Sequence, residues 1–138
     1  MTATNTLSYK DLLIWQKSLN FANEIIDMVE NLETDRKHFR LIEQIESSST
    51  SIAMNIAEGK GRYSSKELHH LMVIARGSLY ETMTLLEIFQ KRNWITLEKF
   101  NELEKQAIEI TKMINAYNKF ISTGSSLKNN SQNFKNTS

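Results

Sequence analysis

The sequence predicts an all-α protein, specifically an antiparallel up-down-up-down four-helix bundle. Its 138 residues include no Pro and only four Gly, so few residues interrupt helices. Apolar residues recur at intervals of three and four over long segments, which is the period of an amphipathic helix. With 40% hydrophobic and 24% charged residues, the chain has the composition of one globular domain with its own core.

Composition also limits the kind of protein. The absence of Cys excludes disulfides and thiolate chemistry. The opening segment, MTATNTLSYK, lacks the apolar stretch of a signal peptide, and the longest apolar run, residues 71–75, is far too short to span a membrane. We therefore expect a cytoplasmic protein with no membrane partner.

The first helix is predicted from Ser8, as its N-cap, to about Leu32, and residues 1–7 are expected to be disordered. Its expected core stripe steps by three and four: Leu12, Trp15, Leu19, Ala22, Ile26 and Val29. A second apolar set widens the apolar arc to about half the helix circumference: Ile14, Phe21, Ile25 and Met28.

The second helix contains five consecutive hydroxyl residues, Ser47 to Ser51, that could also be read as a flexible linker. The apolar rhythm continues across them, however, with Ser49 at a position where a core residue is expected between Ile45 and Ile52. Small hydroxyl side chains can bond to a carbonyl one turn earlier and let a neighbouring backbone approach. We therefore predict one helix, capped by Asp35 and ended by Gly59.

The third helix is predicted to begin after Ser64, with Glu67 completing a capping box. The fourth is predicted from Thr96 to Ile121 and the polar tail 122–138 to be disordered, so that the bundle domain spans residues 8–121. The expected core positions are Leu68, Leu71, Met72, Ala75, Leu79, Met83, Leu86 and Phe89 in the third helix, and Phe100, Leu103, Ala107, Ile110, Ile114, Tyr117 and Ile121 in the fourth.

The third helix, like the first, has more apolar surface than one bundle interface can hide. The additional residues are Val73, Ile74, Tyr80, Leu85 and Ile88. Gly77 stands in the middle of this helix, where Ala would be favoured by about 1 kcal/mol. The surplus predicts self-association into a dimer or a closed ring, through residues that include Ile14, Phe21 and Gly77. The alternative is a monomer with scattered exposed hydrophobic residues.

No motif supports an enzymatic reading. Glu67 and His70 have the E-x-x-H spacing of di-iron bundles, but such sites need two pairs, and Glu67 is already assigned to the capping box. Metalloprotease, nucleophile-elbow and phosphate-loop motifs do not occur. We expect no enzymatic activity, no metal and no cofactor.

Basic residues provide the stronger functional signal. Residues 1–35 carry two Lys and six acidic residues, whereas residues 36–76 carry seven Lys or Arg and four acidic residues. The candidate nucleic-acid-binding residues are Arg36, Lys37 and Arg40 at the start of the second helix, and Lys60, Arg62 and Lys66 around the next connection. Charge and free helix amides would attract phosphate, although ordinary solvated charges are the alternative. Tyr63 could stack on a base or anchor the loop, and we favour the anchor.

Three segments carry a family resemblance: DLLIWQKSL, LIEQIESSSTSIAMNIAEGKGRYSSKEL and ARGSLYETMTLLEI. They resemble the bacterial four-helix-bundle proteins of the 23S rRNA intervening-sequence family. The resemblance implies a homopentameric ring. It also implies a relationship to the accessory variability protein of diversity-generating retroelements, which binds nucleic acid and partners a reverse transcriptase.

The same segments contain four polar residues near apolar faces: Asn55, Glu58, Ser78 and Glu81. Buried polar pairs can fix the register between helices or subunits, so we expect these residues to be architectural, with a ligand site as the alternative. The predicted function is that of a non-enzymatic, oligomeric accessory protein that binds RNA or DNA. The alternative is an adaptor that binds a protein partner without contacting nucleic acid.

Overall fold

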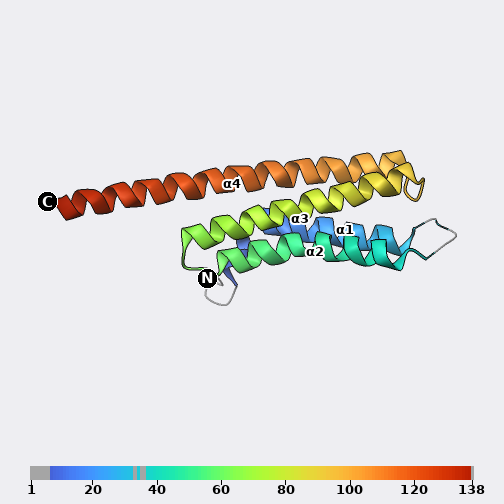
Figure 1. Cartoon of the computed structure of the whole chain (residues 1–138), viewed down its shortest axis with the longest axis horizontal. Helices are drawn as coiled ribbons and strands as arrows, with labels where there is room; N and C mark the ends of the chain where they lie inside the picture. The colour runs from blue at the N-terminus through green and yellow to red at the C-terminus, as the bar shows by residue number, and fades with distance from the viewer. Residues whose placement is uncertain (1–6, 33, 35–36, 138) are drawn as a thin grey trace.

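The all-α prediction is confirmed. The computed structural model describes the backbone of residues 7–32, 34 and 37–137 and the side chains of those residues up to 123. This part contains a 3₁₀ turn, η2 (Ser8–Asp11), and four α-helices, α1 (Leu13–Glu30), α2 (Phe39–Lys60), α3 (Ser65–Lys91) and α4 (Leu97–Thr137), with no strand among the described residues (Figure 1).

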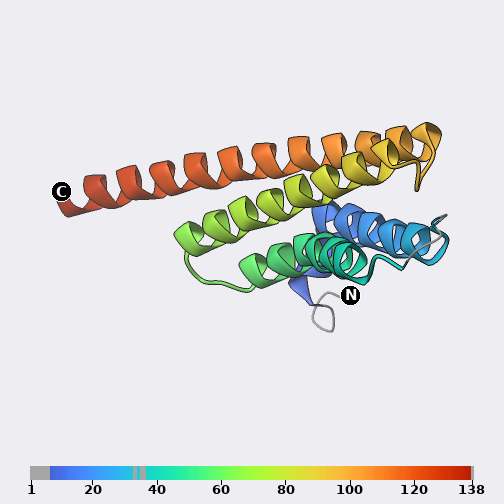
Figure 2. The same cartoon turned by 45° about the vertical axis from the view of Figure 1, so that its right-hand side comes forward.

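The helices lie side by side along the long axis of the molecule (Figures 1 and 2). α2 packs against α1 and α3, and α4 packs against α3 and α1. The connections α1–α2 and α3–α4 lie at one end of the molecule and the α2–α3 connection lies at the other (Figure 1). An ion pair between Lys17 Nζ and Glu109 Oε1, 2.7 Å apart, joins the first helix to the last.

The serine run lies inside α2, which confirms the prediction of a continuous helix. Ser49 is fully buried at the expected core position. The hydroxyl of Ser49 donates to the Glu46 carbonyl at 3.2 Å, and that of Thr50 donates to the same carbonyl at 2.7 Å. These bonds give the hydroxyl groups partners within α2 itself. The run can therefore stay helical and pack against neighbouring helices instead of forming a linker.

The predicted inner face of α1 was only partly right: Ala22 is buried, and Leu12, Trp15 and Val29 are half-buried against the core, but the centre of the buried face lies on the other stripe. The buried residues are Ile14, Ser18, Phe21, Ala22, Ile25 and Met28, whereas Leu19 is 40% exposed. Two stripes, each stepping by three and four, lie about 100° apart on this helix, so periodicity alone does not choose between them. Ile14 and Phe21 are core residues of the single chain, so their role is architectural and they present no surface to a second copy.

The predicted cores of the other helices are largely confirmed. In α3, Met72, Ala75, Leu79, Leu86 and Phe89 are buried, and in α4 all the expected positions are buried except the half-buried Tyr117. Leu85, which was assigned to the surplus face, is buried as well. Ile74, Tyr80 and Ile88 are exposed as expected, so α3 retains an apolar outer face.

Two of the predicted helix starts are confirmed. The Ser64 hydroxyl accepts a hydrogen bond from the Glu67 amide at 3.3 Å, and the Thr96 hydroxyl accepts one from the Lys99 amide at 3.0 Å. Ser8 instead begins the 3₁₀ turn, and α1 starts at Leu13 without a side-chain cap. Asp35 lies outside the described residues, and α2 begins after His38, later than expected.

Gly59 does not end α2. It lies inside the helix, which continues to Lys60, and the following Gly61 has a right-handed backbone with φ of −82°. A Cβ at position 59 would lie 3.1 Å from Leu68 Cδ1 and 3.2 Å from Leu71 Cβ. The close approach of α2 and α3 therefore leaves little room for a larger side chain at position 59, and the glycine does not serve a left-handed turn.

The predicted boundary at residue 122 does not coincide with a helix end, because α4 continues to Thr137 and extends past the other helices (Figure 1). The side chains of residues 124–138 and all of residues 1–6 lie outside the described part. The predicted disorder of both ends therefore stays a prediction.

Candidate functional site

Three predicted cations surround the α2–α3 connection, and we call Lys60, Arg62 and Lys66 the connection cluster. Lys60 is the last residue of α2 and half-buried, Arg62 is exposed in the connection, and Lys66 is exposed in the first turn of α3. Arg62 forms an ion pair with Glu58, one turn earlier in α2. The cluster therefore combines positive charge with the free amides of a helix start.

A surface pocket of about 530 Å³ opens at the same place. It is lined by Arg62, Ser64, Lys66, Glu67, His70 and Leu71. The lining contains two cations and one carboxylate, and the Glu67 amide is already bonded to Ser64. His70, which has the E-x-x-H spacing with Glu67, is exposed.

The cations at the start of α2 form a second group, which we call the start cluster: Lys37 and Arg40. Lys37 precedes the helix and its Nζ lies 5.9 Å from the centroid of the Phe39 ring, while Arg40 is exposed in the first turn. Arg36 lies outside the described residues. Because α2 has 22 residues, the two clusters are separated by about 33 Å of helix. The structure thus places the cations at the two ends of α2.

The favoured anchoring role of Tyr63 was wrong. Its relative exposed area is 106%, so the ring packs against nothing that could hold the connection in place. Phe39, beside the start cluster, is 69% exposed. Each cluster therefore has an exposed aromatic ring next to it.

Three of the predicted architectural residues join α2 to α3 or support that contact. Ser51 and Ser78 hydroxyls are 3.0 Å apart, and the Asn55 side-chain amide donates to the Ser51 carbonyl and hydroxyl oxygens, both at 2.8 Å. At the outer edge, the Gln44 amide donates to the Glu81 carboxylate at 3.2 Å. These contacts are in the single chain, so they fix the register of α2 against α3.

Sequence reasoning missed the buried centre of this contact. Ser48 and Thr82 are both buried, their hydroxyls are 2.8 Å apart, and Thr82 also donates to the Ser78 carbonyl at 2.9 Å. We call Ser48, Ser51, Ser78 and Thr82 the hydroxyl seam. Glu58 lies outside it and pairs with Arg62. Gly77 is exposed, and a Cβ at its position would meet no neighbouring atom within 4 Å.

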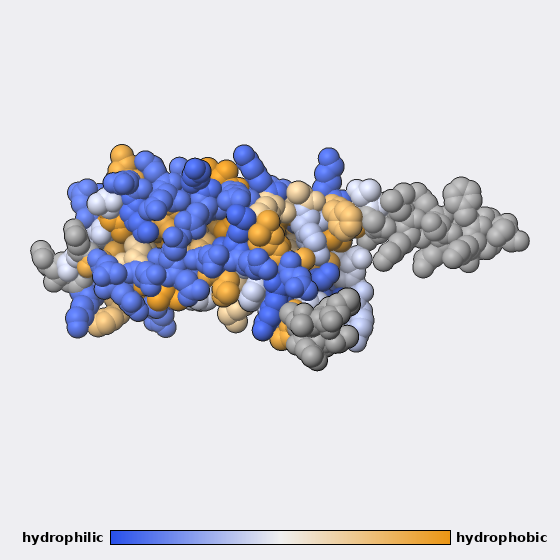
Figure 3. Space-filling view, turned by 180° about the vertical axis from the view of Figure 1, so that it is seen from behind, coloured by the Kyte–Doolittle hydropathy of each residue, from blue (hydrophilic) through white to orange (hydrophobic). Residues whose placement is uncertain are grey.

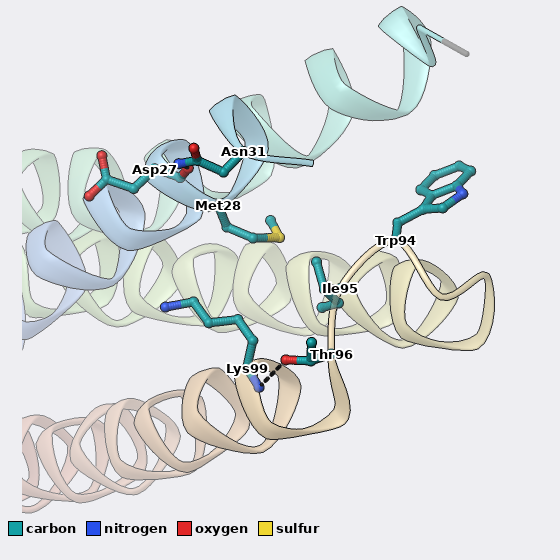
Figure 4. A pocket seen from close by; sticks show the side chains of 7 residues that line it. All are labelled: Asp27, Met28, Asn31, Trp94, Ile95, Thr96 and Lys99. Carbon is teal, nitrogen blue, oxygen red and sulfur yellow. Dashed lines mark hydrogen bonds between the residues drawn. The ribbon is translucent and has the colours of Figure 1, made fainter. Parts of the chain in front are cut away.

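A second pocket, about 270 Å³ in volume, lies between the end of α1 and the α3–α4 connection (Figure 4). Asp27 and Asn31 come from the end of α1 and Lys99 from α4, around the apolar Met28 and Ile95. Trp94 stands at its edge, stacked on His38 with ring centroids 4.0 Å apart and in contact with Phe89. These rings hold the two connections at this end together, and sequence periodicity offered no sign of the contact.

Apolar residues also line grooves on the outside of the bundle. The α1/α2 groove, about 320 Å³, is lined mainly by Trp15, Leu19, Ile26, Ala53 and Met54. The α3/α4 groove, about 360 Å³, is lined by Tyr80, Met83, Glu104, Ala107, Ile108, Thr111 and Lys112. Figure 3 shows hydrophobic atoms exposed among hydrophilic ones on one face of the molecule.

The described residues hold neither a metal-binding group nor a membrane-spanning helix. No three or more of their His, Asp or Glu side chains are placed together so as to hold a metal ion. No helix in that part of the chain has the length and apolar character needed to cross a bilayer. The expected absence of enzymatic activity and of a cofactor stays a prediction.

Comparison with known proteins identifies a family and a similar solved structure. The family described as 23S rRNA-intervening sequence proteins matches residues 10–116. A crystal structure of a protein of unknown function from the S23 ribosomal protein family of Bacteroides thetaiotaomicron has a TM-score of 0.73 and 30% sequence identity, and the match covers 78% of this chain and 99% of that one. Comparison with curated proteins finds no match. The chain belongs to the family of 23S rRNA-intervening sequence proteins.

Proposed function

We propose that this protein is a non-enzymatic, self-associating, up-down-up-down four-helix bundle that binds nucleic acid through the cations at the two ends of α2. The observation that carries the proposal is the arrangement of the connection cluster and the start cluster. Among the described cations of the two clusters, Arg62 has an ion-pair partner in Glu58, and the other four have no described carboxylate within ion-pair distance. Unpaired cations are free to replace the counterions of a phosphate backbone.

The distance between the clusters favours an extended ligand. About 33 Å of helix separates them, which is too far for one small anion to bridge. A polyanion with regularly spaced phosphates can contact both clusters at once, and each contact adds to the affinity.

Self-association is the second part of the proposal. The α1/α2 groove and the α3/α4 groove lie on opposite sides of the bundle, because α1 packs against α2 and α4, and α3 packs against α2 and α4. Different surfaces on opposite sides suit a head-to-tail contact, which forms a ring when the rotation between copies closes. We propose the homopentameric ring that the family resemblance implies, in which the clusters of several copies act together. A reverse transcriptase is the protein partner that the same resemblance suggests.

The test of nucleic-acid binding is its dependence on salt. Binding of labelled RNA, measured by fluorescence anisotropy at about 50 and about 200 mM salt, should weaken as salt rises, with a slope of about 0.7 to 0.9 per phosphate contacted. Replacing Lys60, Arg62 and Lys66 together by Ala should weaken binding and reduce the slope by about two to three. The control is Lys105→Ala, which removes one exposed cation of α4 outside both clusters and should weaken binding far less.

The competing function is that of an adaptor for a protein partner, and the two apolar grooves favour it. Burial of apolar surface depends little on salt, so the two functions respond differently to the same titration. An intact oligomer that binds no RNA or DNA at tens of micromolar protein would contradict the nucleic-acid proposal and leave the adaptor.

A further inference from the structure

We infer that Tyr63 and Phe39 stack on unpaired bases, so that the ligand of the two clusters is single-stranded nucleic acid. This inference rests on the proposed function and makes it more specific. It begins with the exposure of the two rings. Tyr63 is 106% exposed and Phe39 is 69% exposed, so Tyr63 gains none and Phe39 little of the stabilisation that burying an aromatic side chain provides.

The surroundings of each ring suit a nucleotide. Tyr63 lies between Arg62 and Ser64 and close in sequence to Lys66, so a base stacked on the ring would have its phosphate near the connection cluster. Phe39 lies between Lys37 and Arg40, and the Lys37 ammonium is 5.9 Å from the ring centroid. The combination of aromatic faces with adjacent cations is the one by which proteins hold single strands without reading their sequence.

Other aromatic residues are less suited to this role. Trp94 stacks on His38 and contacts Phe89, so its ring is already occupied. Tyr80, 53% exposed, and Phe120, 72% exposed, each line an apolar groove between helices, where they suit contact with another protein surface. Tyr63 and Phe39 differ from these because each lies beside the cations of one cluster.

Stacking requires the face of a base to be accessible. In a duplex both faces are covered by the neighbouring base pairs, whereas a single strand can turn its bases onto a protein ring. A duplex therefore offers the clusters phosphates alone, and a single strand offers phosphates and base faces. The structure thus predicts a preference for single strands that charge by itself would not produce.

The experiment compares three fluorescein-labelled DNA probes of about 20 nucleotides with the full-length protein at about 100 mM salt. The probes are a single strand, its duplex, and a single strand whose central nucleotides are abasic but keep their phosphates. The normal single strand should bind at least about five-fold more tightly than the abasic strand, because a base that stacks on a ring gains affinity that a bare phosphate does not. Equal affinity for the normal and abasic strands would overturn the inference.

Variants of Tyr63 and Phe39 test whether the two aromatic rings cause the tighter binding of the single strand. Tyr63→Leu keeps an apolar side chain but has no aromatic face, and should lose about five-fold or more affinity for the single strand; Tyr63→Phe should retain it within about two-fold. Phe39→Leu should behave like Tyr63→Leu. Affinity for the duplex should be unchanged in all three. A Tyr63→Leu protein that binds the single strand as well as the unaltered protein would contradict the stacking role of that ring.

Two further outcomes separate this inference from the proposed function. If the abasic strand binds as tightly as the normal one and both lose affinity as salt rises, nucleic-acid binding stands and stacking is wrong. If no probe binds at tens of micromolar protein, both are wrong. Light scattering on Tyr63→Leu should give an unchanged mass, since a lower mass would assign Tyr63 to contact between copies and overturn its role in stacking.

Discussion

Gly59 and Gly77 both lie inside helices but differ in their surroundings. A Cβ at position 59 would meet the Leu71 Cβ at 3.2 Å, whereas no neighbouring atom lies within 4 Å of one at position 77. Gly59→Ala should therefore lower the melting temperature, because crowding costs about 1 to 3 kcal/mol and outweighs a gain of about 1 kcal/mol in helix propensity. Gly77→Ala should raise the melting temperature by a few degrees, because it gains helix propensity without any cost from crowding.

Thermal unfolding followed by circular dichroism measures both changes, and each glycine variant is the control for the other. Equal shifts in the same direction would contradict the close approach of α2 to α3 at Gly59. A smaller oligomer in Gly77→Ala would show that another copy approaches that exposed position, which is the architectural role predicted for it.

Ser18 is fully buried in the core face of α1, and its hydroxyl oxygen has no hydrogen-bond partner among the described residues. An unpaired buried hydroxyl costs about 1 to 3 kcal/mol, and Ala is also the better helix former. Ser18→Ala should therefore increase the free energy of unfolding by about 1 kcal/mol or more in a urea titration.

The control for this variant is Ser47→Ala, at an exposed position inside α2. It gains helix propensity without relieving a buried hydroxyl, so the free energy of unfolding should change by no more than about 0.5 kcal/mol. A destabilised Ser18→Ala protein would indicate that a buried water satisfies the Ser18 hydroxyl.

At the level of elements, the contact between α2 and α3 depends on the hydroxyl seam. Thr82→Val keeps the shape of the side chain but removes the bonds to Ser48 and to the Ser78 carbonyl, so it should destabilise the protein by about 1 kcal/mol. Ser48→Ala should destabilise the protein by a similar amount. The double variant should cost less than the sum, with a coupling of about 0.5 to 1 kcal/mol, because the two residues share one hydrogen bond. If the two single variants lower the free energy of urea unfolding additively, the hydrogen bond between Ser48 and Thr82 contributes nothing to stability.

The existence of each helix and most of its core could be predicted from periodicity and caps. The inner face of α1 could not, because both of its apolar stripes fit a helix and only packing against α2 and α4 selects the one that contains Ser18. Pairs such as Ser48 with Thr82 and His38 with Trp94 join segments far apart in the chain, and a single sequence does not show which residues meet.

The candidate site, like the fold, could be predicted from sequence only in part. The connection cluster could be located from sequence because Ser64 caps the start of α3. The start of α2 has no side-chain cap and lies later than expected, so the position of the start cluster relative to that helix was predicted less well. The exposure of Tyr63 could not be predicted, since an aromatic residue in a connection can equally be buried against the helix ends or left in solvent.

For the whole molecule, the two grooves allow a test of how copies associate. Met54→Glu places a charge in the α1/α2 groove and Ile108→Glu places one in the α3/α4 groove, and each position is exposed in the single chain. If copies join head to tail, either variant alone should be monomeric by light scattering. A mixture of the two should form dimers, because one intact contact remains possible between unlike copies. A mixture that stays monomeric would contradict the head-to-tail arrangement.

The contact between α1 and α4, marked by Lys17 and Glu109, also bears on how the chain is made. α4 supplies core residues such as Leu103, Ile110 and Ile114, and it is the last of the four helices to leave the ribosome. Until then the emerging chain carries three helices whose inner surface is uncovered and prone to aggregate. The bundle is therefore completed only after α4 has been synthesised, and a message truncated before Ile114 would yield a protein that chaperones and proteases must remove.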